Sequence, residues 1–214
     1  MKAFIASRLP PSAPGMRIGL FGGSFNPPHD GHRLVAETAL RRLHLHQIWW
    51  MISPGNPLKR QGDLKSLEQR VAMSRMLVRD PRIRVTTFEA EYNLRYTAET
   101  IAFVRRRRPG VHFVWIIGAD NLAGFHKWQN WQTIVETIPI AVIDRPGATL
   151  AFLSAKMAKR FDLARVDEAH AADLALRKAP AWTFIHGPRS FHSSTQLRRQ
   201  EEDGQAHWRI SGKT

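Results

Sequence analysis

The sequence predicts an α/β protein built on one parallel β-sheet with helices on both faces. Short apolar runs rich in β-branched and aromatic residues recur along the chain, and stretches with a helical spacing of apolar residues separate them. The run at 111–118 is almost continuously apolar, which is typical of a central parallel strand. No internal repeat or domain boundary is apparent, so we expect a single domain with a doubly wound sheet.

Strands and helices alternate in the first half of the chain. Residues 17–21, RIGLF, predict a buried strand, and residues 32–44 place apolar side chains at helical spacing. Residues 47–53, QIWWMIS, predict a second strand. After a loop with proline and glycine, residues 66–79 predict a helix, because their SLEQ start has the pattern of a capping box.

The alternation continues to residue 144. Residues 82–89 predict a third strand, and residues 96–108 predict a helix that ends before a Pro–Gly pair. The run at 111–118 is the fourth strand, residues 120–136 are expected to be helical, and residues 138–144 predict a fifth strand. In such a sheet, ligands bind beyond the carboxyl ends of the strands, where the strand order reverses.

The remaining segments are less regular. The alanine-rich residues 147–180 predict a less regular helical insertion, before a last strand at 181–186 and a helix that starts at 193. Prolines interrupt the start of the chain, so we expect residues 1–15 to be a disordered extension before a folded domain at 16–214. A transit peptide is the alternative, because this extension lacks acidic residues.

Composition excludes several classes of protein. The chain has 214 residues with 43% hydrophobic content, which suits one globular domain rather than a disordered chain. No apolar run approaches the roughly 20 residues that cross a bilayer, so we expect no membrane partner. The chain has no cysteine, which excludes disulfides, thiolate catalysis and thiolate zinc sites and is compatible with a cytoplasmic location.

The net charge of +14 indicates a polyanionic partner but does not identify it. A nucleic-acid-binding module would carry this charge on one continuous face, whereas a phosphate-handling enzyme needs only a few cations around a pocket. Much of the excess lies in runs such as Arg105–Arg108, which are typical of solvated helix ends.

The turn GGSFNPPHDGH, between the first strand and the first helix, has the composition of a phosphate-binding loop. Gly22 and Gly23 are expected to let the backbone turn sharply and a ligand approach, while Pro27 and Pro28 stiffen the loop. The helix then begins near Asp30, and its free N–H groups and positive dipole end favour an anion.

His29 and His32 are three residues apart, so both imidazoles can project to one side of that helix start. Each can donate a hydrogen bond to a phosphate oxygen. Two alternatives remain, a metal site without an obvious third ligand and a purely structural turn with capping or solvated histidines. The spacing G-x-G-x-x-G of a dinucleotide-binding turn is absent.

This stretch resembles the signature of the nucleotidyltransferase superfamily with the H-x-G-H motif, and more narrowly that of bacterial nicotinate-nucleotide adenylyltransferases. The one departure is Asn26, where that family commonly has aspartate, and this puts an ionic role there in doubt. The resemblance implies a Rossmann-like fold and adenylyl transfer from ATP to nicotinate mononucleotide, with nicotinic acid adenine dinucleotide and pyrophosphate as products, in NAD biosynthesis.

A second phosphate motif lies near the other end of the chain, in SFHSSTQLRR. Its hydroxyls and N–H groups at a helix start can hold a phosphate, and an arginine one turn further can add a bidentate contact. An ordinary helix cap is the alternative. The stretch resembles the superfamily motif I-S-S-T-x-I-R, with His192 and Leu197 in place of the isoleucines. The residues concerned are Ser193, Ser194, Thr195 and Arg198.

Two further segments resemble family motifs for the acceptor nucleotide. NLRYTAETI is similar to S-Y-T-x-D-T, and IIGADNLAGFHKW matches G-x-D-x(7)-W. Asp120 could accept from ribose hydroxyls, and Trp128 offers a face for a pyridine ring. Trp49, Trp50 and Trp131 are expected to be packing residues instead.

The resemblance therefore implies a full set of site residues. The catalytic residues are His29, His32 and Arg198. Residues that bind ATP are Gly22, Gly23, Ser24, Phe25, His29, His32, Gly118, Asp120, Ser193, Ser194, Thr195 and Arg198. Residues that bind the nicotinate nucleotide are Tyr96, Thr97, Trp128, Arg145 and Lys59, although Thr97 could be a helix cap and Lys59 could be solvated.

Mg²⁺ is the expected cofactor, bound mainly through ATP and water, with no protein metal site. Two alternative activities remain. The acceptor could be nicotinamide mononucleotide or another small phosphate ester such as phosphopantetheine, or the chain could be a basic nucleic-acid-binding module. We expect no stable nucleic-acid partner, and a homo-oligomer is left open.

Overall fold

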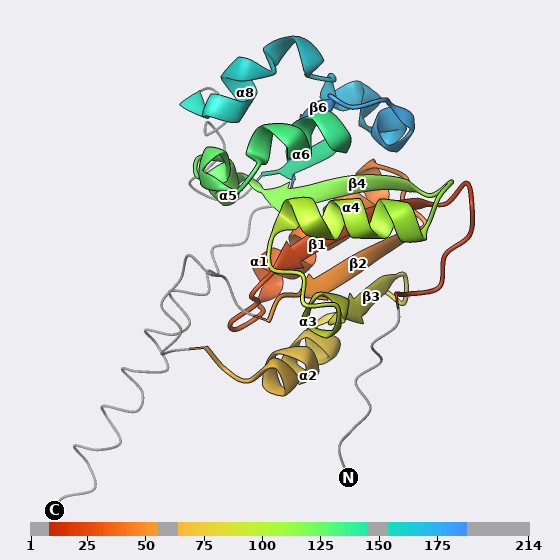
Figure 1. Ribbon diagram of the computed structural model, residues 1–214, viewed down its shortest axis with the longest axis vertical. Coiled ribbons are helices and arrows are strands. Elements are labelled where there is room, and N and C mark those ends of the chain that lie inside the picture. The colour runs from red at the N-terminus through yellow and green to blue at the C-terminus, as the bar shows by residue number, and fades with distance from the viewer. Residues whose placement is uncertain (1–8, 55–63, 145–153, 188–214) are drawn as a thin grey trace, which may run out of the picture.

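The computed structural model describes residues 9–54, 64–144 and 154–187. Within them, one sheet contains six strands in the order β3-β2-β1-β4-β5-β6, and every neighbouring pair is parallel (Figure 1). The chain starts in the middle of the sheet, moves outward to β3, and then crosses back to β4. This reversal between β1 and β4 confirms the doubly wound, Rossmann-like α/β fold. The strands are β1 (Arg17–Gly23), β2 (Gln47–Ile52), β3 (Ile83–Thr86), β4 (His112–Gly118), β5 (Ile140–Ile143) and β6 (Trp182–Ile185).

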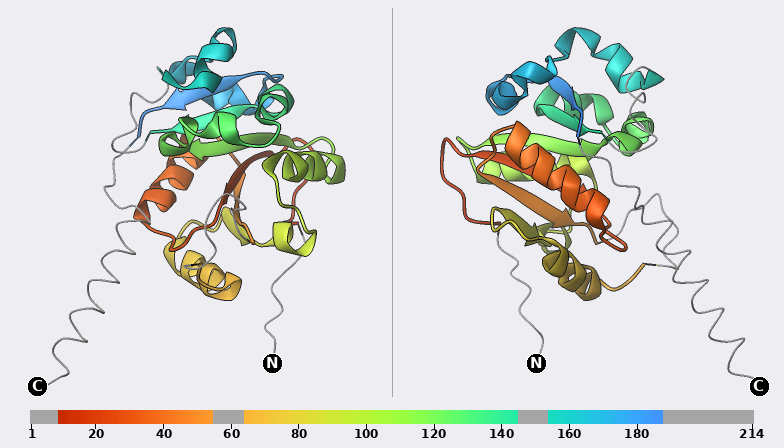
Figure 2. Two further views of the ribbon diagram at one scale, coloured as in Figure 1. Left: turned by 60° about the vertical axis from the view of Figure 1, so that its left-hand side comes forward. Right: turned by 180° about the vertical axis from the view of Figure 1, so that it is seen from behind.

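Helices cover both faces of the sheet, as Figure 2 shows from two further sides. One face packs against α1 (Asp30–Arg42), α2 (Leu67–Leu77) and the 3-10 helix η4 (Glu168–Leu176). The other face packs against α3 (Phe88–Glu91), α4 (Thr97–Arg107), α5 (Ala119–Leu122), α6 (Trp131–Thr137) and α8 (Lys156–Arg160). Two shorter 3-10 helices are η2 (Phe125–Lys127) and η3 (Asp162–Ala164).

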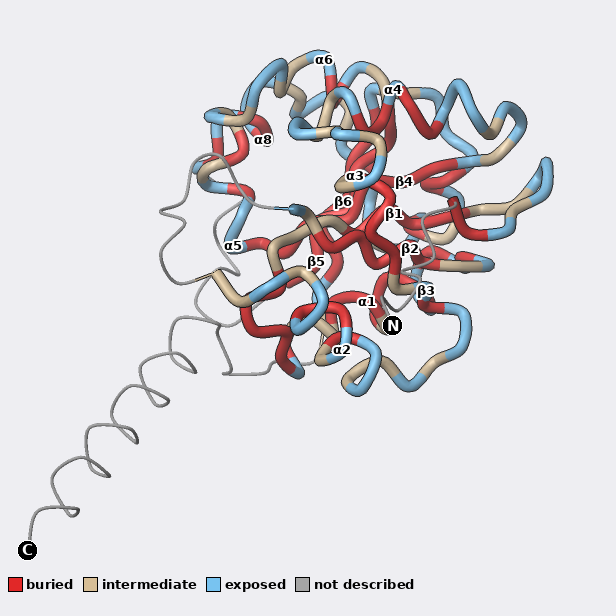
Figure 3. The backbone as a smooth tube through the Cα atoms, turned by 60° about the horizontal axis from the view of Figure 1, so that its bottom comes forward, coloured by how far each residue is buried: buried red, intermediate tan, exposed pale blue. Residues whose placement is uncertain are grey.

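The apolar core lies on the two faces of the sheet, and the central strands are buried along most of their length (Figure 3). Side chains alternate along β2, so Trp49 enters the core under α3 and α4 while Trp50 enters the core under α1. Both are fully buried, as expected for packing residues. Burial of side chains this large on both faces favours folding strongly.

The structure corrects two predicted elements. The third strand ends at Thr86 instead of residue 89, because the chain turns into α3 and buries Phe88 against α4. The predicted helix at 120–136 consists of α5, η2 and α6. Gly124 precedes η2, and Asn130 has a positive φ of 55°, which interrupts a continuous helix before α6.

Residues 9–15 also differ from the disordered extension expected from the sequence. Leu9 is buried, the N–H of Gly15 donates to the carbonyl of Gly110 at 2.8 Å, and Arg108 donates to the hydroxyl of Ser12 at 3.1 Å. These hydrogen bonds place residues 12–15 against the segment between α4 and β4, while Leu9 packs in the core. In the described part of the chain, no helix is long and apolar enough to cross a membrane.

Candidate active site

The turn between β1 and α1 differs from its expected construction. Gly22 and Gly23 do not turn the chain but extend β1, where they pair with the last two residues of β2. A Cβ on Gly22 would lie 3.1 Å from the ring of Trp115, and one on Gly23 would lie 3.2 Å from the ring of Phe25. These glycines therefore make room for aromatic rings. The reversal itself falls at residues 25–28, beginning with Phe25 at a positive φ of 45°.

His29 and His32 lie together at the start of α1, as their spacing predicts. Their ring centroids are 3.7 Å apart, and Nδ1 of His32 accepts from the backbone N–H of His29 at 3.3 Å. This bond uses the Nδ1 lone pair, so a neutral His32 carries its proton on Nε2. His29 is buried and His32 is half-buried. We call residues 24–32 the histidine turn.

An aromatic cluster fixes the orientation of His32. The centroid of its ring is 5.0 Å from Phe25, 6.3 Å from Trp50 and 6.5 Å from Phe21. Phe25 also stacks on Trp50 at 4.5 Å. Rings packed at these angles hold one another in place, so His32 has little rotational freedom. The sequence identified Trp50 as a packing residue but did not show that it packs behind the histidine.

The first turn of α1 contains an acidic residue, Asp30, which forms an ion pair with Arg33. Asp30 is exposed and accepts from Arg33 at 2.9 Å, while Arg33 also pairs with Glu37 at 3.1 Å. The hydrogen bond that Arg33 donates to Asp30 is the main cause of the raised pKa of Arg33. Because Arg33 pairs with Asp30, part of the carboxylate charge is offset, and it weakens the anion-attracting helix start less than a lone acid would.

Asn26 connects the histidine turn to the start of α2. Its side chain is buried, and its Oδ1 accepts from the backbone N–H of Lys65 at 3.0 Å. This contact requires an acceptor and not a charge. The departure from the aspartate that is common in the family therefore preserves a connection between two loops.

The ends of β1 and β4 lie at the same level of the sheet. Leu20 is opposite Trp115, so Gly23 and Gly118, three residues further on, end the two strands together. Strand order reverses between these two strands. The histidine turn and the predicted acceptor residues after β4 therefore leave the sheet next to each other, at the place where ligands bind in such folds.

The segment after β4 contains the G-x-D-x(7)-W residues. Asp120 is exposed in α5, and Trp128 is half-buried at the end of η2. Phe125 contacts Trp128 at 5.0 Å between centroids, and Trp115 meets it edge-on at 6.5 Å. The indole of Trp128 is thus held by two rings while part of it remains accessible.

Tyr96 and Thr97 lie at the start of α4. Tyr96 is the N-cap residue and Thr97 is the first helical residue, so the alternative reading of Thr97 as the cap is wrong. Oε2 of Glu99 accepts from the N–H groups of Arg95 and Tyr96 at 3.1 and 3.2 Å. Tyr96 is 37% exposed and so is available to a ligand. We call Tyr96, Thr97, Asp120 and Trp128 the acceptor side.

Two buried charged residues near these segments were not predicted. Glu89 in α3 accepts from the hydroxyl of Thr100 at 2.8 Å, and burial raises its pKa from 4.5 to about 7. Arg70 in α2 is 1% exposed, and burial lowers its pKa. The position of Arg70 in the helix could have predicted its burial, because it lies on the same helix face as Val71 and Ser74, which are both buried.

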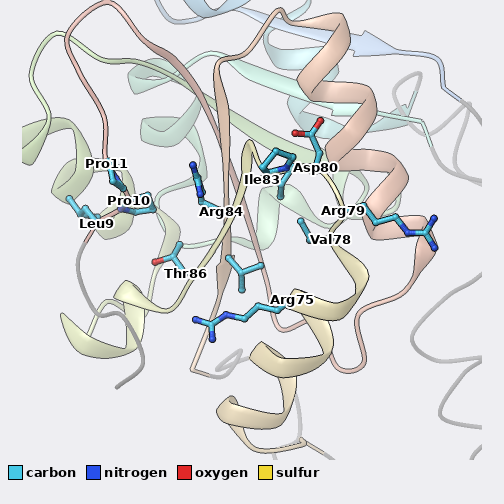
Figure 4. A pocket seen from close by; sticks show the side chains of 12 residues that line it. Leu9, Pro10, Pro11, Arg75, Val78, Arg79, Asp80, Ile83, Arg84 and Thr86 are labelled. Carbon is cyan, nitrogen blue, oxygen red and sulfur yellow. The ribbon is translucent and has the colours of Figure 1, made fainter. Parts of the chain in front are cut away.

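Several predicted site residues lie outside the described residues, namely Lys59, Arg145, Ser193, Ser194, Thr195 and Arg198. A separate cavity of about 540 Å³ lies along the edge strand β3 (Figure 4). Its lining includes Leu9, Ile83 and the arginines Arg75, Arg79 and Arg84, and none of the predicted site residues. This cavity is therefore separate from the site at the carboxyl ends of β1 and β4.

A doubly wound sheet whose first strand leads into an H-x-G-H helix start defines a nucleotidyltransferase. A family model described as cytidylyltransferase-like matches residues 20–200. The chain belongs to this family, and within it to the nicotinate-nucleotide adenylyltransferases, as the following relatives show.

A "Probable nicotinate-nucleotide adenylyltransferase" of Mesorhizobium japonicum is 60% identical over 191 residues, which cover 89% of this chain and 98% of the relative. A protein of the same name from Rhizobium meliloti is 63% identical over 183 residues, or 86% of this chain and 97% of the relative. The fold matches Plasmodium falciparum nicotinic acid mononucleotide adenylyltransferase complexed with NaAD, with a TM-score of 0.65 and 20% identity. That match covers 86% of this chain and 83% of the solved chain.

Proposed function

We propose that this protein transfers the adenylyl group of ATP to nicotinate mononucleotide. A phosphate oxygen of the mononucleotide attacks the α-phosphorus of ATP, a new P–O bond forms, and the bond to the β-phosphate oxygen breaks. The products are nicotinic acid adenine dinucleotide and pyrophosphate. The observation that carries the proposal is the pair of adjacent imidazoles, with ring centroids 3.7 Å apart, at the start of the helix that follows β1, the strand next to β4.

The chemistry needs little more than positioning and charge stabilisation, because the attacking phosphate is already anionic. His29 and His32 would donate to the α- and β-phosphates, where negative charge accumulates as pyrophosphate leaves. The backbone of Gly22, Gly23, Ser24 and Phe25 would border the ATP. The aromatic cluster around His32 and the hydrogen bond from the backbone N–H of His29 support this role, since they orient the His32 imidazole before ATP arrives.

The acceptor side would bind the mononucleotide. Trp128 is supported from behind by Phe125, which leaves its accessible part for stacking on the pyridine ring. Tyr96 and Thr97 at the start of α4 would face the nicotinate carboxylate, for which a helix start is favourable. Gly118 would allow close approach at the end of β4, and the exposed Asp120 would accept from ribose hydroxyls.

The remaining roles follow from the family resemblance. Lys59 and Arg145 would contact the acceptor nucleotide and its phosphate. The second phosphate motif would hold the β- and γ-phosphates, and Arg198 would add a bidentate contact. The residues of that motif are Ser193, Ser194, Thr195 and Arg198.

We assign the divalent cation of this reaction to Mg²⁺, bound mainly by ATP and water. Phosphate oxygens and water supply the hard oxygen ligands that Mg²⁺ prefers, so this assignment requires no cage of protein ligands. When bound, the cation would neutralise charge on the phosphates. The lack of cysteine is compatible with work in the reducing cytoplasm.

The decisive experiment measures pyrophosphate release from ATP with a panel of acceptors. The panel contains nicotinate mononucleotide, nicotinamide mononucleotide and phosphopantetheine, each with Mg²⁺. We expect turnover with the nicotinate form to exceed that with the other two. A preference for the amide form or for phosphopantetheine would show that the proposed substrate is wrong. Tight, salt-sensitive binding of oligonucleotides without turnover would indicate a nucleic-acid-binding module instead of an enzyme.

A further inference from the structure

Arg70 is a buried cation whose guanidinium donates hydrogen bonds to four backbone carbonyls. It lies in the first turn of α2, and 1% of its surface is exposed. Its Nη1 donates to Ser24 at 2.7 Å and to Ser53 at 2.8 Å. Its Nε donates to Lys65 at 3.0 Å, and its Nη2 lies 3.4 Å from the carbonyl of Pro54.

These four carbonyls belong to two loops that the proposed function uses. Ser24 opens the histidine turn, directly after the end of β1. Ser53 and Pro54 follow the end of β2, and Lys65 precedes α2. One side chain therefore contacts the chain after β2, the chain before α2 and the first residue of the histidine turn.

Among the described residues, no carboxylate accepts a hydrogen bond from the Arg70 guanidinium. Glu68 contributes only a weaker electrostatic attraction and is itself exposed. A buried guanidinium is costly unless its donors are satisfied, and here carbonyl dipoles satisfy them. Its positive charge, directly beneath Ser24, is therefore not cancelled by a buried carboxylate.

We propose that Arg70 is a positioning residue for the triphosphate of ATP. It fixes the histidine turn relative to the end of β2 and the start of α2, and it adds a buried positive charge below the phosphates. Asn26 contributes a second connection between the same loops, through the Lys65 N–H. This inference rests on the proposed function, because the histidine turn must bind ATP.

The guanidinium geometry explains why this position needs arginine. One planar group with five donors reaches carbonyls from three chain segments, whereas a lysine ammonium has three donors on one atom. A neutral side chain of similar length would fill the space but leave buried carbonyls unsatisfied. Arg70→Lys therefore keeps the charge and loses the geometry, while Arg70→Met loses both.

The test compares Arg70→Met and Arg70→Lys with Arg75→Met, an exposed arginine on the same helix that lies outside the proposed site. Calorimetry measures binding of α,β-methylene ATP, and steady-state kinetics give KM for ATP and for nicotinate mononucleotide separately. We expect Arg70→Met to weaken analogue binding at least tenfold and to raise KM for ATP similarly, with KM for the mononucleotide within twofold. Arg70→Lys should fall between Arg70→Met and the wild type, and Arg75→Met should match the wild type.

Thermal melting separates positioning from folding. If Arg70→Met does not fold, Arg70→Lys and Asn26→Ala test the proposed role instead. We expect each of them to weaken analogue binding threefold or more. Folded variants with normal analogue binding would overturn the inference, as would equal losses for both substrates in proportion to the unfolded fraction. Failure of the proposed function looks different, because the wild type would then bind the analogue but transfer to no acceptor.

Discussion

The histidine turn and the acceptor side are supported in different ways. The histidine turn is held from below by Arg70, by the Asn26 contact and by rings packed around His32. On the acceptor side, Tyr96 and Asp120 are exposed. Trp128 on that side is held by the rings of Trp115 and Phe125.

The difference matches what each region would have to do. Stabilising charge that develops during phosphoryl transfer requires donors that do not reorganise, because the gain depends on geometry fixed in advance. Recognition of the acceptor needs specific contacts but less rigidity, and exposed side chains can supply them. We therefore expect substitutions in the histidine turn to affect turnover and those on the acceptor side to affect the KM of one substrate.

The largest effect should come from His32→Ala. Removing one preorganised donor typically costs on the order of 10² to 10³ in kcat. We expect at least this loss in pyrophosphate release, with the melting temperature close to that of the wild type. His112→Ala, at the exposed start of β4 and the opposite end of the strand, is the matched control and should remain fully active. Turnover of His32→Ala near the wild-type rate would contradict the assignment of the site.

A second effect concerns stability and the buried carboxyl of Glu89, behind the acceptor side. Its pKa is about 7 in the folded protein against an ordinary value of 4.5. The folded protein keeps this proton where the unfolded chain releases it, so the free energy of unfolding falls as pH rises from 4.5 through 7. The full change is on the order of 3 kcal/mol.

The measurement is denaturant unfolding of the wild type and Glu89→Gln at pH 5 and pH 8. Glutamine still offers an oxygen to Thr100 but cannot ionise. We expect similar stabilities at pH 5 and a more stable variant at pH 8. Equal pH dependence in both proteins would show that the proton on Glu89 is not responsible.

Trp128→Ala should have a smaller effect that is confined to one substrate. Stacking of a base on an aromatic side chain is worth about 1–3 kcal/mol by alanine substitution, which corresponds to a rise of roughly fivefold to 150-fold in KM for nicotinate mononucleotide. KM for ATP should stay within twofold. Trp131→Ala is the matched control, because Trp131 packs edge-on against Phe125 and Phe161 and should affect melting without affecting KM. A parallel rise in both KM values would contradict the assigned stacking.

The sequence predicted the parallel fold and the adjacency of His29 and His32 because both depend on local pattern. Apolar periodicity marks strands and helices, and a spacing of three residues at a helix start determines which side chains meet. The roles of Gly22 and Gly23 could not be predicted, since the rings of Trp115 and Phe25 reach them through the fold. Arg70 and Glu89 were missed for the same reason, because their burial depends on segments that are distant in sequence.

The smallest expected effect is that of Asn26→Asp, which restores the residue that is common in the family. The contact at this position needs an acceptor for the Lys65 N–H, and a carboxylate oxygen is also an acceptor. Arg70 binds the carbonyl of the same Lys65, so its charge lies near enough to offset part of the cost of burying a carboxylate. We expect KM for ATP within twofold of the wild type and a change in unfolding free energy below about 1 kcal/mol. Asn26→Ala, which leaves the N–H without this acceptor, should lose about 1–3 kcal/mol by the same denaturant measurement. If Asn26→Asp loses as much as Asn26→Ala, the amide itself is required here, and the histidine turn differs from that of its relatives in more than charge.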